Sequence, residues 1–293
     1  MMNRRQSRAS RHSLSALARA WETRYVIVLA FAYLISFGWL FSAGTDVDIR
    51  PSEILVTPGE PLWKTPGDGH LFGTTATGLD LFHLCRIAMA RAVAVAAIAT
   101  ALGLALAFLT VMLFAFDPGE RRFSLLKSWG RVGVLMPCAL VLLIVQAGAG
   151  GGITSFVVAT SLLISIHSAP AMAEWFEKGE KGHDILSAYV VGLSRSEIVT
   201  NRIVPTVIRK LIGIFATLIP QVALVEMGVS FLGMGSERLS IGGLISYGQQ
   251  VIIEAPWLAI YPGIFASVVT MFLTLLGWLT SRALKSEPIR RFI

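Results

Sequence analysis

Long apolar runs, each about the length needed to cross a lipid bilayer, constrain this chain more than any other feature. With 54% hydrophobic and 15% charged residues, it is too apolar for an ordinary soluble domain. A helix needs roughly 20 predominantly apolar residues to span the hydrocarbon core. The sequence therefore predicts an all-α membrane protein with six transmembrane helices, at about 25–43, 87–116, 132–148, 153–173, 207–235 and 257–281.

Lysine and arginine residues lie mainly on alternate connections between these runs. The segments 1–24, 117–131, 174–210 and 282–293 hold 20 of the 25 such residues. Because connections rich in Lys and Arg stay on the cytoplasmic side of a membrane, this asymmetry predicts that both termini are cytoplasmic. The same charges account for the net charge of +7, so we expect no nucleic-acid partner.

The pattern of runs and charges also predicts how the chain is divided. A basic cytoplasmic arm, 1–24, precedes the first span, 25–43. A proline-containing and glycine-containing external loop, 44–86, follows that span. The remaining five spans form a core at 87–293, and this core contains a cytoplasmic segment at 174–206.

Motifs for catalysis and for metal binding do not occur in the sequence. Cys85 and Cys138 stand in unrelated contexts, and the histidines are isolated from one another, so no metal ligand set is predicted. No phosphate-binding GxxxxGK[ST] loop, HExxH or GxSxG is present. We therefore expect no enzyme activity, cofactor or metal on this chain.

The cytoplasmic stretch 183–205 has the pattern of two short helices joined by a glycine. Gly192 can adopt the left-handed conformation that ends a first helix. Ser194 and Glu197 form the pattern of a capping box that begins a second helix, and Pro205 breaks that helix or opens the next one. Such a pair fits either a groove on a partner protein or the inner leaflet. The apolar face of the first helix comprises Ile185, Leu186, Ala188, Tyr189, Gly192 and Leu193.

Glu226 is an acidic residue inside an apolar span. A carboxylate in the membrane is costly and marks a proton relay or a substrate contact in some proteins. The alternative is a structural group that faces the bundle and accepts a hydrogen bond from a hydroxyl or backbone donor. We favour the structural interpretation, because no partner cation lies near Glu226 in the same span.

The stretch 183–205 resembles the cytoplasmic coupling signature of permease subunits in ABC importers. That pattern has a pair of small residues, a glycine four residues after the second of them, and a proline thirteen residues after the glycine. Ala188, Gly192 and Pro205 match it in register. Leu186 and Ser187 replace its Glu and first Ala.

Three further stretches, in the same order along the chain, resemble the peptide-type members of this family, in particular the C-type permease of dipeptide, oligopeptide and nickel systems. Thr75 and Leu79 stand where the family has Asp and Arg. The resemblance covers roughly residues 70–285. The matching residues are Phe72-Gly73-Thr74 with Gly78 and Asp80; Glu226 with Ser230-Phe231-Leu232-Gly233-Met234-Gly235; and Ala255-Pro256-Trp257-Leu258 with Pro262-Gly263.

The resemblance implies the type I importer permease fold and a location in the bacterial inner (plasma) membrane. It implies a heteromeric complex with a second permease subunit, two cytoplasmic ATPase subunits that hold ATP and Mg, and an external or periplasmic solute-binding protein. The chain would form half of a translocation path for peptides, in contact with membrane lipid. The residues implied to contact the ATPase are Ile185, Ala188, Tyr189, Gly192, Leu193, Ser194 and Pro205.

Two alternatives remain open at this stage. The substrate could be a nickel chelate, glutathione or another small solute. The chain could also be a non-transporting sensor or assembly subunit that retains the permease fold.

Overall fold

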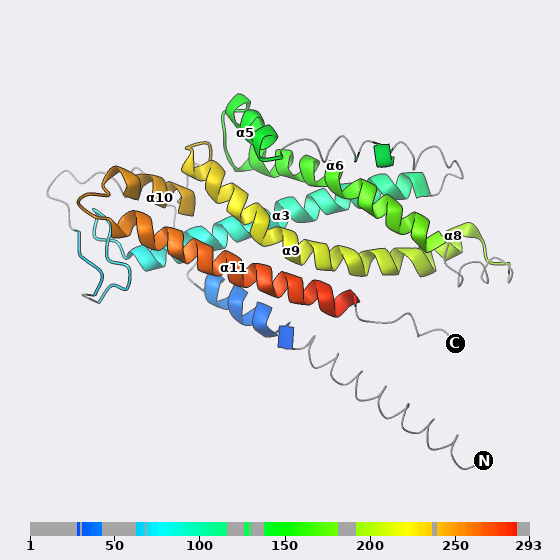
Figure 1. Cartoon of the computed structure of the whole chain (residues 1–293), viewed down its shortest axis with the longest axis horizontal. Coiled ribbons are helices and arrows are strands. Elements are labelled where there is room, and N and C mark those ends of the chain that lie inside the picture. Colours follow the sequence, from blue (N-terminus) through cyan, green and yellow to red (C-terminus); the bar gives the residue numbers. More distant parts are fainter. Residues whose placement is uncertain are drawn as a thin grey trace, which may run out of the picture.

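A computed structural model describes residues 28–29, 31–42, 63–67, 69–115, 126–128, 130, 138–180, 192–235 and 239–285. Within these ranges the structure is helical apart from turns and one isolated β-bridge. Its long helices lie side by side along one axis, as Figure 1 shows. They are α3 (Leu81–Ala115), α6 (Ile153–Glu180), α9 (Val204–Phe231) and α11 (Trp257–Lys285), with shorter helices α5 (Cys138–Gly148), α8 (Arg195–Ile198), η1 (Val199–Ile203) and α10 (Ile241–Gln250).

In the described residues, four helices are long and apolar enough to cross a membrane. They are Leu81–Ala115, Ile153–Glu180, Arg195–Phe231 and Trp257–Leu284. Four of the six predicted spans are therefore confirmed as helices of sufficient length. The other two are present as shorter apolar helices, Phe31–Phe41 and Cys138–Gly148, and the rest of those two predicted spans lies largely outside the described residues.

Several helices extend beyond the predicted spans by a few residues. Helix α3 begins at Leu81, six residues before the predicted start, because the turn before it caps the helix. Helix α6 continues through Pro170 to Glu180, beyond the predicted end at 173. Helix α10 is additional, and its first turn is capped by Ser240, whose hydroxyl accepts a hydrogen bond from the Gly243 amide (3.0 Å).

Small residues line the face of α3 that packs against the other helices. At Gly103 a Cβ atom would lie 2.8 Å from the carbonyl oxygen of Ser161 on α6, so the two backbones are close together. The Ser161 hydroxyl also donates to the Ala99 carbonyl oxygen (3.1 Å). Because lipid is as apolar as the side chains, close packing and interhelical hydrogen bonds hold membrane helices together. The buried small residues of α3 include Cys85, Ala88, Ala92, Ala96, Ala99, Gly103 and Ala107.

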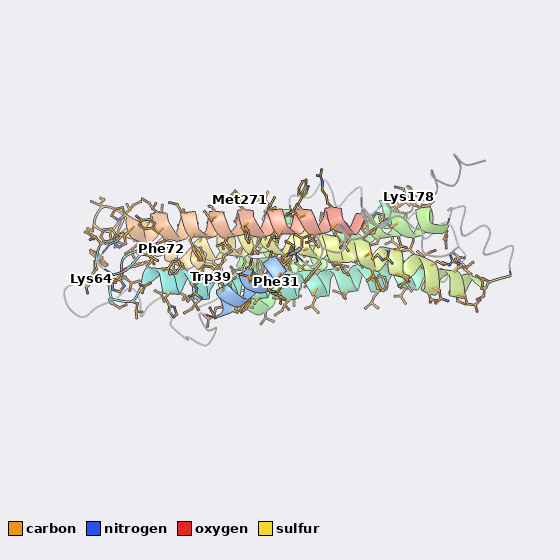
Figure 2. All side chains as sticks on the ribbon, turned by 90° about the horizontal axis from the view of Figure 1, so that it is seen from below. Phe31, Trp39, Lys64, Phe72, Lys178 and Met271 are labelled. Atoms are coloured by element: carbon orange, nitrogen blue, oxygen red, sulfur yellow. The ribbon has the colours of Figure 1, made fainter. Side chains whose placement is uncertain are left out.

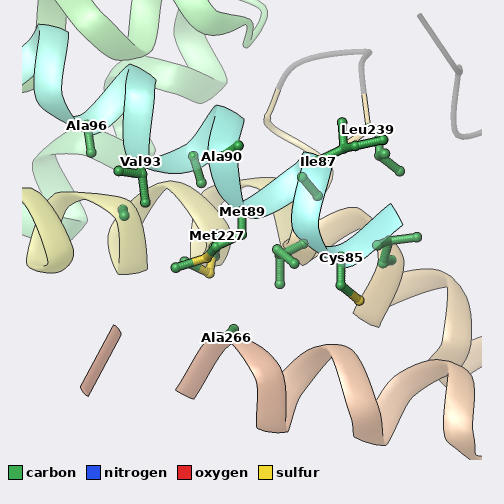
Figure 3. Close-up of a cluster of buried hydrophobic side chains, with 14 of the residues drawn as sticks. Cys85, Ile87, Met89, Ala90, Val93, Ala96, Met227, Leu239 and Ala266 are labelled. Carbon is green, nitrogen blue, oxygen red and sulfur yellow. The ribbon is translucent and has the colours of Figure 1, made fainter. Parts of the chain in front are cut away.

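Two separate clusters of buried apolar side chains hold the two ends of the bundle. We call the first the α10-end core; it joins α3, α9, α10 and α11 through residues such as Val93, Met227, Leu244 and Ala266, together with Leu239 just before α10 (Figure 3). We call the second the α8-end core; it joins α3, α6 and the helices from α8 to α9. In Figure 2, Lys64 and Phe72 lie at the α10 end and Lys178 lies toward the α8 end.

The contact between α9 and α11 provides a test of backbone proximity. A Cβ atom at Gly277 would lie 2.5 Å from the Ala216 carbonyl oxygen, whereas Gly263 on the same helix has open space. We expect Gly277→Ala to lower the free energy of unfolding by about 1–3 kcal/mol, because the helices must separate to admit the methyl group. Thermal unfolding in detergent measures this loss. Gly263→Ala is the control and should change stability little; equal effects of the two substitutions would contradict the proposed packing.

Candidate functional site

The residues that the resemblance implies to contact an ATPase are described only in part. Ile185, Ala188 and Tyr189 fall within 181–191, outside the described residues. Gly192 has φ of +89°, which confirms the left-handed conformation predicted for it. A Cβ atom there would have no neighbour within 4 Å, so the backbone conformation rather than lack of space requires glycine. Leu193, beside it, is exposed.

The predicted capping box is present at the start of α8. The Ser194 hydroxyl accepts a hydrogen bond from the Glu197 amide (3.4 Å), and the Glu197 carboxylate accepts one from the Ser194 amide (2.8 Å). Two backbone N–H groups that a helix start leaves without partners are thereby satisfied. This local signal was sufficient to locate the helix start from sequence.

Pro205 does not interrupt the helix that follows. It lies in the first turn of α9, which is the second of the two predicted alternatives. The preceding η1 is a π-helix, in which the Val204 amide donates to the Val199 carbonyl oxygen, five residues back. A proline has no N–H and its ring crowds the preceding turn, so the wider turn accommodates it. The chain from 195 to 231 is thus one 37-residue helix.

The α8-end core connects this helix start to the long helices. Ile198, Val199 and Ile203 are almost fully buried there, against Val111 of α3 and Phe176 of α6. A Cβ atom at Gly179 of α6 would lie 3.3 Å from Ile203, which again indicates close approach. Movement of α8 therefore requires movement of α6 and α9 as well.

Charged and aromatic contacts surround the α8-end core. The Arg195 guanidinium donates to the Glu180 carboxylate (3.0 Å), which links the start of α8 to the end of α6. Lys127 forms an ion pair with Glu177. The Lys210 ammonium lies 5.1 Å from the centre of the Trp175 ring. Sequence reasoning missed these pairs, since each joins residues on separate segments or at spacings without a helical signal.

Glu226 is buried within α9 toward the α10 end. The Ser230 hydroxyl donates to its Oε1 atom (2.8 Å), while Oε2 has no hydrogen-bond partner. A cavity of about 10 Å³ adjoins the carboxyl group. The hydroxyl contact is of the kind that the structural interpretation predicts, whereas the unpaired Oε2 is not, and the role of the carboxyl group stays a prediction. Other residues that line the cavity are Val95, Gly152, Ile153, Phe156, Val229 and Gly235.

The residues after Glu226 end α9 in a glycine turn. Gly233 has φ of +75°, and the Met234 amide donates to the Val229 carbonyl oxygen (3.1 Å). A Cβ atom at Gly235 would collide with Ser230, so the turn folds back onto the hydroxyl that contacts Glu226. The stretch Glu226–Gly235 is therefore one structural unit.

A second turn structure precedes α3. Gly73 has φ of +77° and no room for a side chain, because a Cβ atom would lie 2.6 Å from the Lys64 carbonyl oxygen. Thr74 and Asp80 form the isolated β-bridge. Thr75, which replaces the family's Asp, accepts a hydrogen bond from the Leu79 amide (3.2 Å) through its hydroxyl. Since Asp and Thr side chains both make such local turns, this replacement keeps the acceptor.

Aromatic side chains join this turn to the start of α11. Phe72 stacks on Tyr261 with ring centres 5.1 Å apart, and the Trp257 indole lies 3.5 Å from the Thr74 carbonyl oxygen. Two of the stretches that resemble the permease family, Phe72–Asp80 and Ala255–Gly263, are thus brought together, although 183 positions separate Thr74 from Trp257. Sequence reasoning missed this contact.

Comparisons with known proteins find relatives of one kind. A putative peptide transport system permease of Brucella suis is 26% identical over 223 residues, which are 73% of each chain. The oligopeptide permease OppC of Escherichia coli is 39% identical over 90 residues, 30% of each chain. The dipeptide permease DppC of Alkalihalophilus pseudofirmus is 23% identical over 86% of this chain and 81% of its own. The predicted resemblance to peptide-transport permeases is confirmed.

No protein-family model matches the chain. A solved structure of an amino acid ABC transporter with histidines is 18% identical, with a TM-score of 0.49 over 68% of this chain and 93% of that chain. The resemblance to peptide-transport permeases thus rests on the curated relatives.

Asp80 gives a pH-dependent test of the turn before α3. Burial acts to raise its pKa, but hydrogen bonds with His70 and with the His83 and Phe82 amides, together with the His70 charge, hold the pKa below its usual range. The stabilisation is present above the unfolded pKa of about 3.9 and is lost as pH falls through the lower folded value. We expect Asp80→Ala to lower the free energy of unfolding by about 1 kcal/mol at neutral pH.

Unfolding of the original protein and of Asp80→Ala at a series of pH values measures the difference in their free energies of unfolding. The difference should begin to shrink below about pH 4, where Asp80 of the unfolded chain becomes protonated, and should disappear as pH falls through the lower folded pKa. Asp80→Asn keeps a capping side chain without the charge and should show a smaller loss. A difference that stays constant down to pH 3 would mean that the carboxylate charge has no part in the turn.

The Glu226 contact predicts different effects for two substitutions. Glu226→Gln keeps an oxygen that accepts from Ser230, so the free energy of unfolding should change by less than about 1 kcal/mol. Glu226→Ala leaves the Ser230 hydroxyl without this acceptor and should cost about 1–3 kcal/mol. Thermal unfolding of the two variants and the original protein measures their stability, and substrate uptake by cells that carry them measures transport. Abolished uptake in a normally folded Glu226→Gln protein would instead indicate a functional carboxyl group.

Proposed function

We propose that this chain is the transmembrane permease subunit of an ATP-driven importer for peptides or peptide-like solutes. The observation that carries this proposal is the similarity to peptide-transport permeases over 73% of the chain. The chain would form half of the translocation path, together with a second permease subunit. An external or periplasmic solute-binding protein would deliver the substrate. ATP hydrolysis would take place on two cytoplasmic ATPase subunits.

In this proposal the chain crosses the bacterial inner membrane six times, with both termini in the cytoplasm. The α8 end is cytoplasmic, as the Lys and Arg content of 174–210 favours. The α10 end, with its turn before α3, is then external. Large apolar side chains are exposed along the long helices, including Leu109, Leu113 and Met271, the last of which is labelled in Figure 2. They would contact lipid or the second permease.

The 184–200 segment would couple the chain to the ATPase. Its apolar face would lie in a groove on that subunit, as amphipathic helices do in helix-in-groove contacts. The described part supports a lever: Gly192 sets the turn, the capping box begins α8, and the α8-end core joins α8 to α6 and α9. Displacement of α8 by the ATPases would therefore tilt whole helices between two arrangements.

Gly192→Leu tests this coupling role. A leucine at φ of +89° is strained, so the turn must change shape while the membrane helices keep their packing. We expect normal membrane insertion, but a fall of about tenfold or more in substrate-stimulated ATP hydrolysis by the purified complex, equivalent to about 1.4 kcal/mol of coupling. Gly150→Leu is the matched control, because Gly150 has φ of +77° and open space but lies in the turn between α5 and α6.

Co-purification tests the proposed complex itself. The tagged chain should bring down two ATPase chains and a second permease. A lone stable chain would favour the sensor or assembly alternative, and unchanged stimulation in Gly192→Leu would remove the coupling role from this turn. Mass spectrometry of the ligand held by the associated binding protein would separate peptides from nickel chelates, glutathione and other solutes.

A further inference from the structure

Arg195 lies within the proposed coupling segment, 184–200, and Glu180 lies just before that segment. Glu180 is the last described residue of α6, and Arg195 is the first residue of α8. The Arg195 guanidinium lies 3.0 Å from the Glu180 carboxylate, with both side chains about one-third exposed (34% and 27%). A charge-assisted hydrogen bond of this kind has a defined direction as well as attraction. The pair therefore orients the start of α8 relative to the end of α6.

The end of α6 carries three glutamates, and their contacts differ in what they join. Glu174 pairs with Lys178 one turn further along the same helix, and both side chains are well exposed. Glu177 pairs with Lys127, which belongs to a different segment. Glu180 pairs with Arg195 across the chain connection. Within the described residues, the Glu174–Lys178 ion pair joins two positions of α6 only, so it serves as a comparison for the Glu180–Arg195 pair.

The neighbours of Arg195 are held by other contacts. Glu197 belongs to the capping box with Ser194, and Ile198 is buried in the α8-end core. These contacts hold the axis of α8, but none of them reaches the last residue of α6. Glu180 supplies that contact. Because a partly exposed ion pair adds little to global stability, its loss should affect the direction of α8 more than folding.

We infer that Glu180 and Arg195 are a positioning pair that sets the angle at which the coupling segment meets the ATPase. The inference rests on the proposed function, since it assigns these residues a role in the same coupling step. Neither residue needs to touch the ATPase. The pair acts by holding the start of α8 at a set distance and orientation relative to α6.

A charge swap in the full complex tests the pair. The complex, with its ATPases and binding protein, is reconstituted in proteoliposomes carrying Glu180→Arg, Arg195→Glu or both. Each single change places like charges together, so the ratio of substrate-stimulated to basal ATP hydrolysis should fall about fivefold or more. The double change restores opposite charges and should return the ratio to within about twofold of the original. The thermal unfolding midpoint and ATPase co-purification should be unchanged throughout.

Matched variants separate the possible outcomes. Glu174→Arg breaks a pair within α6 and should leave the ratio unchanged. Glu180→Gln, a milder change, should lower the ratio even if Glu180→Arg does not fold. Full stimulation in both single variants, or no recovery in the double variant, would overturn the inference. If Gly192→Leu abolishes stimulation in the same assay while the single charge variants do not, the inference about the Glu180–Arg195 pair is wrong but the coupling role of the segment stands. If Gly192→Leu has no effect either, the proposed coupling function is wrong as well.

Discussion

Close packing of helix backbones through small residues is the interaction on which the rest of this structure depends. In lipid there is no hydrophobic gain from bringing two apolar helices together, so contact distance decides whether they associate. Alanines and glycines let α3 approach α6, and Gly277 lets α11 approach α9. Large apolar residues fill the two cores and also cover the exposed faces of the helices.

Both ends of the bundle use glycines with positive φ to turn the chain, but the turns have different roles at the two ends. At the α10 end, glycines with positive φ allow the turns before α3 and after α9 to fold tightly, and aromatic stacking holds the turn before α3 to α11. At the α8 end, Gly192 and a capping box start a long helix that is buried in its own core. Along the long helices, hydroxyl groups find local partners; the Thr270 hydroxyl, for example, donates to the Ala266 carbonyl oxygen one turn back (2.7 Å). Glu226 shows the same economy, because its hydroxyl partner is one turn away on its own helix.

Features that depend on neighbours close in the sequence were predictable, and contacts between distant residues were not. The capping box of Ser194 and Glu197 and the left-handed Gly192 were predictable, because these signals involve neighbours within three or four positions. The contact of Trp257 with Thr74 was not, because no local pattern links residues so far apart. The π-turn before Pro205 was also missed: the proline indicated a disturbance, but whether the helix breaks or widens depends on what packs around it. Helix α10 was missed because only ten residues carry it.

The sequence alone determined that the chain is helical and suited to a membrane, since hydropathy and helix signals are properties of short stretches. It also determined the resemblance to peptide-transport permeases, since the matching residues stand in order along the chain. Only the tertiary structure decided which face of each apolar helix is buried, because every face is apolar and periodicity carries little contrast in such a chain. The tertiary structure also decided that Glu180 meets Arg195 and that Phe72 meets Tyr261. Those partners lie on different helices or turns, and only packing in three dimensions brings them within bonding distance.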